Sequence, residues 1–529
     1  MTSLQIANRK IKDLQIQNDN LKTNLKQQKD QYEDKIDKMQ KDFDKKFAAI
    51  MSVVSDLQNK VNKLEDENAK LKKENAELKK RVQELENEND ILKGKAAKNT
   101  TNSSIAPSKD ENIKQPNHRE KSNRKQGGQK GREGKTLTKE FIENLIKQEN
   151  VEVIEEEYGN PKSTETTVKY KIDTKTTIVI TKITIYGNVK EEVEKSGLPQ
   201  ALLNKSTVIY GSNIKTLVGV MAQEEVIAVD RMNEFIKILT EGNLNISHGS
   251  ICNWIHELGI KSKKIVKKLA KRLKNGKIIC TDATTSNVSG KKAYIRNYSN
   301  LNITVFKPSS TKSMRAIKGH NILNGYKGYI MHDHEKGLYN FGIRANHVEC
   351  WIHLGRDLKY LTENVKNEWS EELWKFGWNA NKRRKELKEK GINSFTEKEI
   401  EEYHNEYKRI IEKGYIENSK ITSKYFRDKE LAVLKRVRDY ETAYLKFLED
   451  FDIPFDDNLS ERDLRPTKTK KKIIGCHRSF QGLKDYCNVR SIISTCKKQS
   501  ISFFRVLKAV MEGQTICVSK EGLIGLLAY

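Results

Sequence analysis

The first segment of the chain repeats apolar side chains with the seven-residue period of a coiled coil. Leucine recurs at every seventh position, and valine or asparagine lies three residues before each leucine; the two series are Leu57, Leu64, Leu71, Leu78, Leu85, Leu92 and Val54, Val61, Asn68, Asn75, Val82, Asn89. This combination favours a parallel dimer, and a solitary helix would leave the apolar stripe exposed. We therefore expect a leucine zipper over residues 1–93 and a homodimer formed through it.

Polar and basic residues follow the heptads and predict a flexible linker over residues 94–136. Within it, Gly127-Gly128-Gln129-Lys130-Gly131-Arg132-Glu133-Gly134-Lys135-Thr136 ends like a phosphate-binding loop. That loop needs a glycine where Gln129 stands and an apolar strand before it, and neither is present. We therefore exclude nucleotide binding and expect either contacts with a DNA backbone, through Lys130 and Arg132, or a plain linker.

Two different periodicities follow the linker. Residues 137–200 alternate in strand fashion, as in Val168–Ile172 and Thr177–Thr181, and predict a small β-rich subdomain. Residues 201–270 are helical, with a break at Gly242-Asn243 after which Ser247 or Ser250 can cap a helix that carries Ile251, Trp254, Ile255 and Leu258. Helix, turn and helix fit either a DNA-reading helix-turn-helix or simple helical packing.

The remaining chain predicts an α/β core with a helical insertion. Short apolar strands are expected at Ile278–Cys280, Ala293–Asn297, Ile303–Phe306 and Tyr329–Met331, with a helix around Ser313–Leu323. A long charged helical stretch follows, and the tail after Glu461 is helical again. We therefore expect the first part of the core in residues 271–365, the insertion in 366–450, and the last part with its C-terminal helices in 451–529.

Composition narrows the class of partner. The chain has 529 residues with 99 Lys and Arg against 72 Asp and Glu, a net charge of +27, which favours a nucleic acid. The seven cysteines, none before Cys252, form no disulfide pattern and indicate a reducing cytosol. No run of about 18 apolar residues occurs, so we expect no membrane partner.

Three acids indicate the chemistry. Asp282 and Asp333 each end an apolar run, and Glu461 lies among arginines before Lys468, Lys470, Lys471 and Lys472. Carboxylates that converge on two divalent ions can cleave phosphodiesters, and Mg²⁺ prefers such oxygen ligands. The alternative is structural: a strand-end aspartate can be a turn residue or a helix cap, and Glu461 can pair with Arg462 or Arg465.

Several motifs together resemble the insertion sequence 66 family of bacterial DDE transposases. They are the zipper, the Gly-Gly-Gln segment at Gly127, Thr281-Asp282-Ala283-Thr284, Asp333, Cys350-Trp351-Ile352-His353-Leu354-Gly355-Arg356, Asn458-Leu459-Ser460-Glu461-Arg462-Asp463-Leu464-Arg465-Pro466, Gly475–Gly482 and Arg490–Thr495. The resemblance covers nearly the whole chain. It implies an α/β RNase H-like catalytic core with a helical insertion, after a long N-terminal coiled coil and a small β-rich and helical DNA-binding region.

The resemblance also implies an activity and its residues. The expected reaction is DNA cleavage and strand transfer at the ends of an insertion element, with Mg²⁺, for which Mn²⁺ can substitute. The catalytic and metal-ligating residues would be Asp282, Asp333 and Glu461, with His353, Arg356, Arg462 and Arg465 as accessory residues. Candidate DNA contacts are Lys130, Arg132, Lys470, Lys471, Lys472 and Arg478. Expected partners are double-stranded DNA, as element ends and target, and accessory proteins of the same element, in a bacterial cytoplasm at the nucleoid.

Two departures from the family pattern qualify these expectations. The region of the family's zinc-binding domain, here around Tyr158–Pro161, has no cysteine, so no structural zinc is expected. Ala283 replaces the acidic residue that usually follows the first aspartate, so activity is expected to be altered rather than lost.

The residues around His353 have simpler interpretations as well. His353 with Cys350 is half of a zinc site without a second ligand pair. We expect instead that His353 and Arg356 face the scissile phosphate or brace Asp333, and that Trp351 belongs to the core. Two other functions stay open: a non-catalytic dimeric DNA-binding protein derived from a transposase, and an RNase H-like nuclease that cuts without joining.

Overall fold

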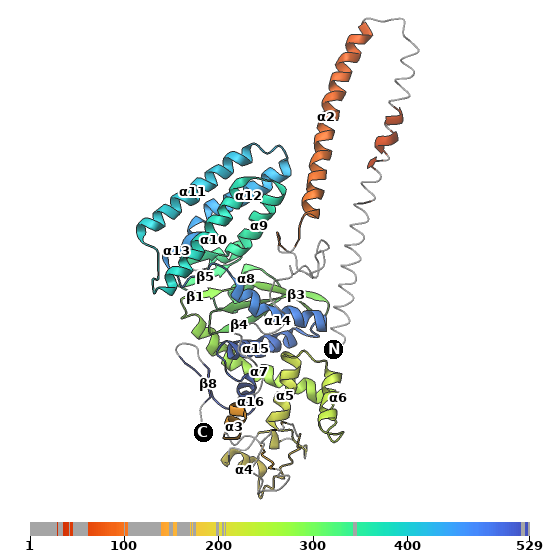
Figure 1. The fold of residues 1–529 in the computed structure, drawn as a ribbon. Coiled ribbons are helices and arrows are strands. Elements are labelled where there is room, and N and C mark those ends of the chain that lie inside the picture. Colours follow the sequence, from red (N-terminus) through yellow and green to blue (C-terminus); the bar gives the residue numbers. More distant parts are fainter. Residues whose placement is uncertain are drawn as a thin grey trace, which may run out of the picture. The chain divides into compact units, whose positions relative to one another are not determined.

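A computed structural model of the protein describes residues 208–341, 346–519 and 524–526 continuously. Before them it describes residues 62–99, 101–103, 139–147, 152–155, 176–196 and 200–203, with a few isolated positions. The chain divides into two compact units, one of residues 1–111, 185–235 and 246–529 and the other of residues 112–184 and 236–245. The larger unit contains the sheet and most of the helices (Figure 1).

A mixed six-stranded sheet forms the centre of the larger unit (Figure 1). Its strands are β1 (Ile278–Cys280), β2 (Ala283–Val288), β3 (Lys291–Ser299), β4 (Thr304–Ser309), β5 (Tyr329–His332) and β6 (His347–Glu349). Strand β3 pairs antiparallel with β1, β2 and β4, whereas β1, β5 and β6 run parallel to one another. The four strands predicted from the sequence are all present; β2 and β6 were not predicted.

Strands β1 and β2 are two halves of one interrupted strand. Cys280 of β1 is paired with Ser299 of β3, and Ala283 of β2 is paired with Arg296 of the same strand, which is the same antiparallel register on both sides of the break. The sheet therefore has five strand positions in the order β4, β3, β1/β2, β5 and β6. Asp282 lies at the break between the two halves.

Helices cover both faces of this sheet, as the alternation of its buried residues requires. Ile279 and Ile330 pack in a core with α7 (His248–Leu273), α8 (Met314–His320), α15 (Phe480–Lys498) and α16 (Phe503–Met511). Cys280 and Met331 point to the other face and pack in a second core with α9 (Trp351–Asn364) and the insertion. A third core joins β2, β3 and β4 to α14 (Asn458–Ile474) and α15.

The segment expected to be a helical insertion forms four helices: α10 (Glu368–Glu389), α11 (Glu397–Ser419), α12 (Lys424–Asp439) and α13 (Glu441–Glu449) (Figure 1). Thr396 begins α11 with a capping box, in which its side chain and that of Glu399 satisfy each other's backbone N–H groups. Upstream of the sheet lie α5 (Ser212–Gln223) and α6 (Val229–Leu239). The predicted cap of α7 is confirmed: the Ser247 hydroxyl accepts the Ser250 N–H at 3.1 Å.

The remaining elements are shorter or lie outside this core. They are α2 (Asn62–Ala96), α3 (Lys139–Lys147), α4 (Val189–Lys195), the short η2 (Gln200–Leu203) and η3 (Lys336–Asn340), and the antiparallel pair β7 (Ile516–Val518) and β8 (Ile524–Leu526). No described helix is both long enough and apolar enough to cross a membrane. All seven cysteines are free thiols.

Two expectations for the N-terminal half need correction. Residues 139–147 are helical, because Ile142, Leu145 and Ile146 share one helical face, and residues 177–181 form no strand with any described residue. The start of the expected linker is also ordered: the buried Asn102 amide donates to Ala97 and to Glu363 of α9. The rest of the linker, with Lys130 and Arg132, and most of residues 1–61 lie outside the described residues.

Candidate active site

Asp282 and Asp333 follow paired strands on the same face of the sheet. The parallel pairing of β1 and β5 ends with Cys280 beside Met331, and the Thr281 N–H continues the ladder to the Met331 carbonyl at 3.0 Å. Each aspartate lies two residues beyond its member of that pair, and a strand returns to the same face every second residue. The register therefore brings the two carboxylates together.

The electrostatics of Asp282 agree with this register. Burial raises the pKa of the Asp282 carboxyl above its usual value, and the negative charge of Asp333 raises it further. The Ala283 N–H, which donates to the Asp282 carboxylate at 2.6 Å, acts in the opposite direction, as do the positive charges of Lys468 and His353. Two half-buried carboxylates thus lie close together, and the nearby N–H group and positive charges offset only part of their mutual repulsion.

The Asn297 side chain holds the backbone of Asp282 at the break between β1 and β2. Asn297 is fully buried on β3, and its N–H donates to the Asp282 carbonyl at 3.0 Å. In a regular antiparallel pair, the Asp282 N–H would donate to the Asn297 carbonyl. Here the Asp282 N–H donates instead to the Asn297 side-chain oxygen at 2.9 Å, and the Asn297 carbonyl accepts the Thr281 hydroxyl at 2.7 Å. Asp282 therefore has a fixed backbone although the regular pairing is interrupted.

Glu461 reaches the same region on the first turn of α14. Helix α14 packs on β2 and β3, and Asp463 anchors it by accepting hydrogen bonds from Ser299, Thr304 and Lys498 at 2.6–2.8 Å. The side-chain amide of Asn297 lies 3.5 Å from the Ser460 carbonyl, just before Glu461. The residue that fixes Asp282 therefore also contacts the start of the helix that carries Glu461.

The Glu461 carboxylate pairs with two groups of α9. It lies 3.5 Å from His353 Nε2 and 3.4 Å from the Arg356 guanidinium. Arg462 and Arg465, the pairing partners considered from the sequence, are exposed and have no ion pair with it. His353 and Arg356 thus brace Glu461 rather than Asp333, which was not foreseen because α9 and α14 lie far apart in the chain.

Helix α9 begins directly after β6 and beside the end of β5. The Cys350 N–H donates to the carbonyl of His332, the residue before Asp333, at 3.1 Å, and the Trp351 N–H donates to Phe455 at 3.1 Å. The prediction that Trp351 belongs to the core is confirmed: it is fully buried, stacks on Phe455 and donates from Nε1 to the Tyr444 carbonyl.

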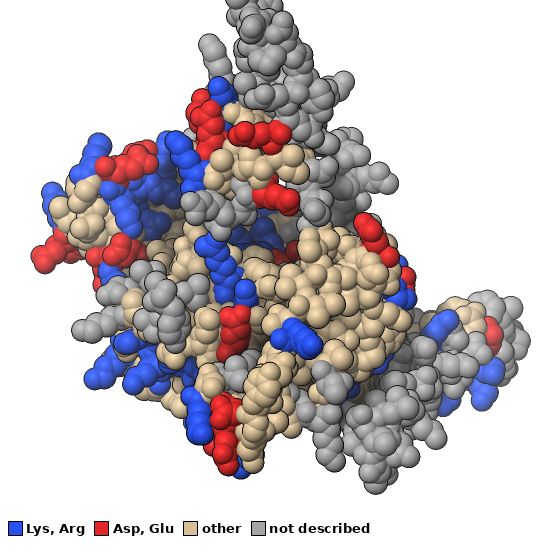
Figure 2. Space-filling model, turned by 90° about the horizontal axis from the view of Figure 1, so that it is seen from below, with Lys and Arg blue, Asp and Glu red and all other residues tan. Residues whose placement is uncertain are grey.

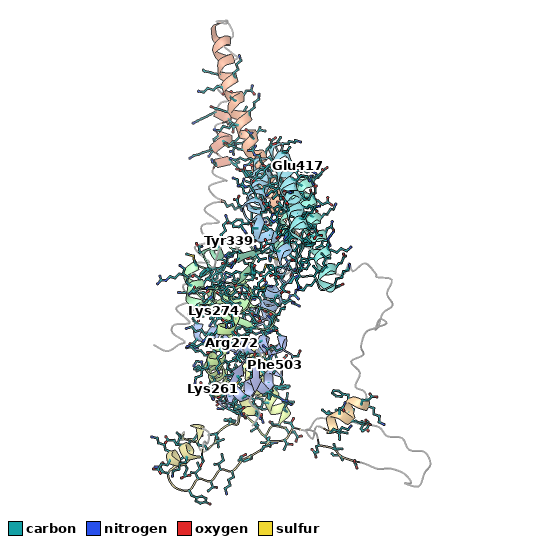
Figure 3. The ribbon with its side chains drawn as sticks, turned by 90° about the vertical axis from the view of Figure 1, so that its left-hand side faces the viewer. Lys261, Arg272, Lys274, Tyr339, Glu417 and Phe503 are labelled. Atoms are coloured by element: carbon teal, nitrogen blue, oxygen red, sulfur yellow. The ribbon has the colours of Figure 1, made fainter. Side chains whose placement is uncertain are left out.

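A polar cavity of ≈ 200 Å³ lies next to Asp333 and His353. Its wall includes Glu349, whose carboxylate accepts hydrogen bonds from the His334 ring at 2.8 Å and the Tyr339 hydroxyl at 2.5 Å. Burial alone would raise the pKa of Glu349, but these partners and His332 lower it overall. Figure 3 labels Tyr339, which belongs to this network. His334 itself has a left-handed backbone, with φ of 63°, directly after Asp333.

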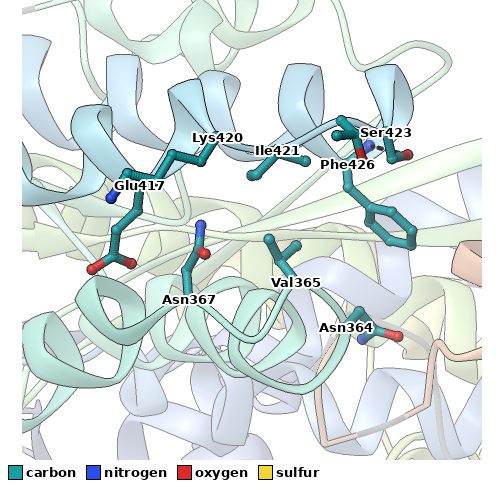
Figure 4. Close-up of a pocket in the computed structure, with 9 residues that line it drawn as sticks. Asn364, Val365, Asn367, Glu417, Lys420, Ile421, Ser423 and Phe426 are labelled. Carbon is teal, nitrogen blue, oxygen red and sulfur yellow. Dashed lines mark hydrogen bonds between the residues drawn. The ribbon is translucent and has the colours of Figure 1, made fainter.

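A second and wider cavity, of ≈ 330 Å³, lies within the insertion. Figure 4 shows its lining, which comes from the α9–α10 and α11–α12 connections and includes Asn367, Glu417 and Phe426. None of the three acids lines it. Cavity volume alone would therefore indicate a site away from the three acids.

The predicted DNA-contacting residues fall into different environments. Lys472 and Arg478 are exposed, and Lys471 is half-buried and donates to the Thr285 hydroxyl at 2.8 Å. Lys470 is buried and donates to the Ala222 carbonyl and to Gln223, because it faces α5 across the helix contact. On the face shown in Figure 2, Lys and Arg lie among Asp and Glu around a broad area of other residues. The positive charge on that face is therefore spread out rather than gathered in one patch.

The acids of this site differ in how well they suit a divalent ion. Within the described part of the chain, no three His, Cys, Asp or Glu side chains lie close enough together to hold one metal ion. The carboxylates of Asp282 and Asp333 nevertheless fit a hard cation by their chemistry, because both are oxygen donors and the negative charge of Asp333 raises the pKa of Asp282. The assignment of metal ligands stays a prediction.

Three residues around this site were not singled out from the sequence. Asn297, Asp457 and Asp463 act through cross-strand and helix-to-sheet contacts, which no local pattern in the chain reveals. The one available signal was the acidic Asp456-Asp457 pair just before the Glu461 motif.

Comparison with known families identifies the chain over more than half of its length. Residues 208–485 match the family described as Transposase IS66 family, and this segment is more than half of the chain. It runs from the residues before α5 into α15 and contains all three acids. A comparison with curated proteins finds no match.

Proposed function

The chain belongs to the IS66 family of transposases, and from this premise we propose that it is a DNA transposase that cleaves and joins DNA at the ends of an insertion element, with a divalent cation. The observation that carries this proposal is the register of β1 and β5, which brings Asp282 and Asp333 together on the same face of the sheet. Double-stranded DNA is the expected partner, and the net charge of +27 suits it.

We further propose an RNase H-like arrangement for the core. Three antiparallel strand positions followed by two parallel ones, with the first aspartate on the central strand, support it. Helix α14 lies against the antiparallel half and brings Glu461 toward that strand. The long insertion between α9 and α14 accounts for the separation of Glu461 from the two aspartates along the chain.

The residues at this site have separate roles in the proposed reaction. Asp282 and Asp333 would hold Mg²⁺, with Mn²⁺ as a substitute, and the bound ion would activate the attacking oxygen and stabilise the leaving oxygen. Asn297 fixes the Asp282 backbone, and His353 and Arg356 orient Glu461. Because both groups of α9 can donate hydrogen bonds, they can also contact a phosphate oxygen that enters beside Glu461.

We propose that the protein acts as a homodimer through its coiled coil. Leu78, Val82, Leu85 and Leu92 of α2 are between 49% and 64% exposed in the single chain. An apolar stripe of this kind is unusual on a helix that stays alone in water. A second zipper helix would cover it.

The Asp282→Asn variant tests the proposed function. It removes one charged oxygen ligand while preserving size, so we expect Mg²⁺-dependent cleavage and joining of an oligonucleotide with an element end to fall by at least about a thousandfold. Binding of the same oligonucleotide should stay within about twofold of the wild type. The assay uses the full chain and separates cleaved from joined products on a gel.

The outcomes distinguish the alternatives. Full activity of Asp282→Asn would contradict the assignment of the active site. Cleavage without joined product in the wild type would identify a nuclease instead of a transposase. DNA binding without either product, at all Mg²⁺ and Mn²⁺ concentrations, would identify a non-catalytic DNA-binding protein.

A further inference from the structure

The second half of helix α7 carries basic residues and no acids. Between Leu258 and Thr281 the chain has nine Lys and Arg and no Asp or Glu. Four exposed lysines of this segment recur at spacings of three, four and seven residues, which puts them on one side of the helix. These four, Lys263, Lys264, Lys267 and Lys271, form what we call the α7 lysine face.

The neighbouring cations on α7 already have partners within the protein. Lys261 pairs with Glu257 at 2.7 Å, and the ammonium groups of Lys268 and Lys274 donate to backbone carbonyls at 3.0 Å and 2.9 Å. Figure 3 labels Lys261 and Lys274, which lie toward the two ends of this basic segment. Among the residues that the structure describes, no member of the α7 lysine face has an ion pair.

A fifth lysine lies beside this face. Lys307 belongs to β4, which contacts α7, and its side chain is half-buried. Burial lowers the pKa of Lys307, and the positive charges of Lys267 and Lys263 lower it further. The lysines of α7 and β4 are therefore close enough to repel one another.

Stabilisation of α7 itself explains only part of this charge. Cations interact favourably with the dipole at a helix C-terminus, but the effect is confined to the last turn, which here holds Lys271 and Arg272. Lys263 and Lys267 lie earlier, and like charges four residues apart destabilise a helix. A face that meets only water usually carries both signs of charge. The α7 lysine face is therefore best explained by a partner that supplies negative charge.

The α7 lysine face lies on the side of the sheet away from the two aspartates of the proposed active site. The buried side of α7 packs in the core that contains Ile279 and Ile330, so its exposed side points away from the sheet. Asp282 and Asp333 belong to the opposite face of the sheet, which packs against α9. A phosphate bound by these lysines is therefore not the phosphate beside the aspartates.

We propose that the α7 lysine face, together with Lys307, binds the phosphate backbone of duplex DNA outside the segment that is cleaved. This inference rests on the proposed function and adds a second DNA contact to it. Lys263 and Lys271 are about 12 Å apart along the helix at a rise of about 1.5 Å per residue. A duplex presents about seven phosphate charges over that length. Because contacts to phosphates carry no sequence information, the affinity of this site should not depend on DNA sequence.

The triple variant Lys263→Gln/Lys267→Gln/Lys271→Gln tests the inference. Glutamine keeps the helix propensity of lysine and removes the repulsion, so the Tm should equal or exceed that of the wild type. Affinity of the full chain for a mixed-sequence duplex of about 30 base pairs should fall about tenfold or more at about 100 mM salt. The slope of log affinity against log salt should become shallower by about 2–3, because three phosphate contacts are lost. Fluorescence anisotropy of the labelled duplex measures both quantities.

Three lysines of the insertion provide the matched control. Lys375, Lys398 and Lys408 are exposed, and each has a glutamate beside it, through an ion pair or in the sequence. Their replacement by glutamine changes the net charge by the same amount but should leave the affinity within about twofold of the wild type. An equal loss in this control would show that net charge alone sets the affinity, and it would overturn the inference.

Lysine acetylation of the wild-type protein locates the contact without any substitution. With the same duplex bound, mass spectrometry should show slower acetylation of Lys263, Lys267 and Lys271 than in the free protein. Lys375 and Lys408 should react equally in both states. Equal acetylation of the α7 lysine face in both states would contradict the proposed contact.

The results distinguish this inference from the proposed function. If the triple variant binds the duplex as the wild type does, while Asp282→Asn loses cleavage, the α7 lysine face has no role in DNA binding and the proposed active site stands. If the wild type binds no duplex even at low salt, the proposed function itself is wrong.

Discussion

Lys470 is buried although it belongs to a run of basic residues in the sequence. Its ammonium group donates to the Ala222 carbonyl and to the Gln223 side chain, both at 2.8 Å, and lies 4.4 Å from the centre of the Tyr486 ring. Burial lowers the pKa of Lys470 to about 7, and the nearby Arg490 contributes in the same direction. The residue therefore joins α14 to the end of α5, so the predicted contact with DNA would be left to its exposed neighbours.

This pKa gives a pH-dependent stability. Above pH 7 the folded protein loses the Lys470 proton, whereas the unfolded chain keeps it up to about pH 10.5. Because the unfolded state then binds more protons, this residue should raise the free energy of unfolding with pH, by up to about 1.4 kcal/mol per pH unit. Lys470→Met removes this contribution, so urea unfolding at pH 7, 8 and 9 should show a smaller increase with pH than in the wild type.

The exposed Lys472 provides the matched control. Lys472→Met should follow the pH dependence of the wild type, because its ammonium group is solvated in both states. If the free energy of unfolding rises equally with pH in Lys470→Met and the wild type, the Lys470 amine keeps its proton in the folded protein.

At the scale of elements, the start of α9 depends on two glycines. The Trp374 ring of α10 lies on Gly355 of α9, and the Trp351 ring of α9 lies on Gly377 of α10. A β-carbon at either glycine would overlap the facing ring. The two helices can therefore approach closely only because each has no side chain at that position. This contact supports the helix that carries His353 and Arg356.

Gly377→Ala should strain this contact. We expect it to destabilise the protein by about 1–3 kcal/mol, since overpacking forces a ring or a helix to shift. The displaced Trp351 begins α9, so the proposed cleavage should weaken as well. Chemical denaturation and the oligonucleotide assay measure the two effects.

An exposed helical glycine separates this packing effect from helix propensity. Gly319 of α8 has no atom near the position of an added β-carbon. Gly319→Ala should therefore be neutral or stabilise the protein by up to about 1 kcal/mol. Equal effects of the two substitutions would contradict the packing argument.

At the scale of the whole molecule, the question is whether α2 brings two chains together. The exposed leucines of α2 keep the seven-residue spacing, and Asn68, Asn75, Val82 and Asn89 occupy the other core position. In a parallel pair these asparagines would meet each other and penalise other registers. Two copies of the active site would then be held near two ends of one DNA element.

The double variant Leu78→Lys/Leu85→Lys should abolish the dimer, because four ammonium groups would be buried at one seam. The molecular mass measured by size-exclusion chromatography with light scattering should fall from twice the 61.1 kDa mass of the chain to the mass of a single chain. Glu77→Lys, which adds a lysine outside the seam, should stay dimeric. A wild-type protein of single-chain mass at micromolar concentration would contradict the zipper.

Sequence patterns predicted correctly those elements that depend only on neighbouring residues. Apolar runs predicted the four strands from Ile278 to Met331, and of the two serines predicted as possible caps of α7, Ser247 is the one that caps it. Strand β2 escaped prediction because Thr284, Thr285, Ser286 and Asn287 lack apolar alternation. Its position comes from pairing with β3, which is a property of the sheet and not of the segment.

The sequence by itself determined which acids could matter, where the α/β core is interrupted by helices, and which family the chain resembles, because these are properties of short segments and of their order. Only the tertiary structure decided which groups meet: Asn297 with Asp282, His353 and Arg356 with Glu461, and Lys470 with α5. Strand register and helix crossing bring these residues together from positions far apart in the chain. The same contacts bury Asp457 at the start of α14, and no pattern along the chain could reveal that burial.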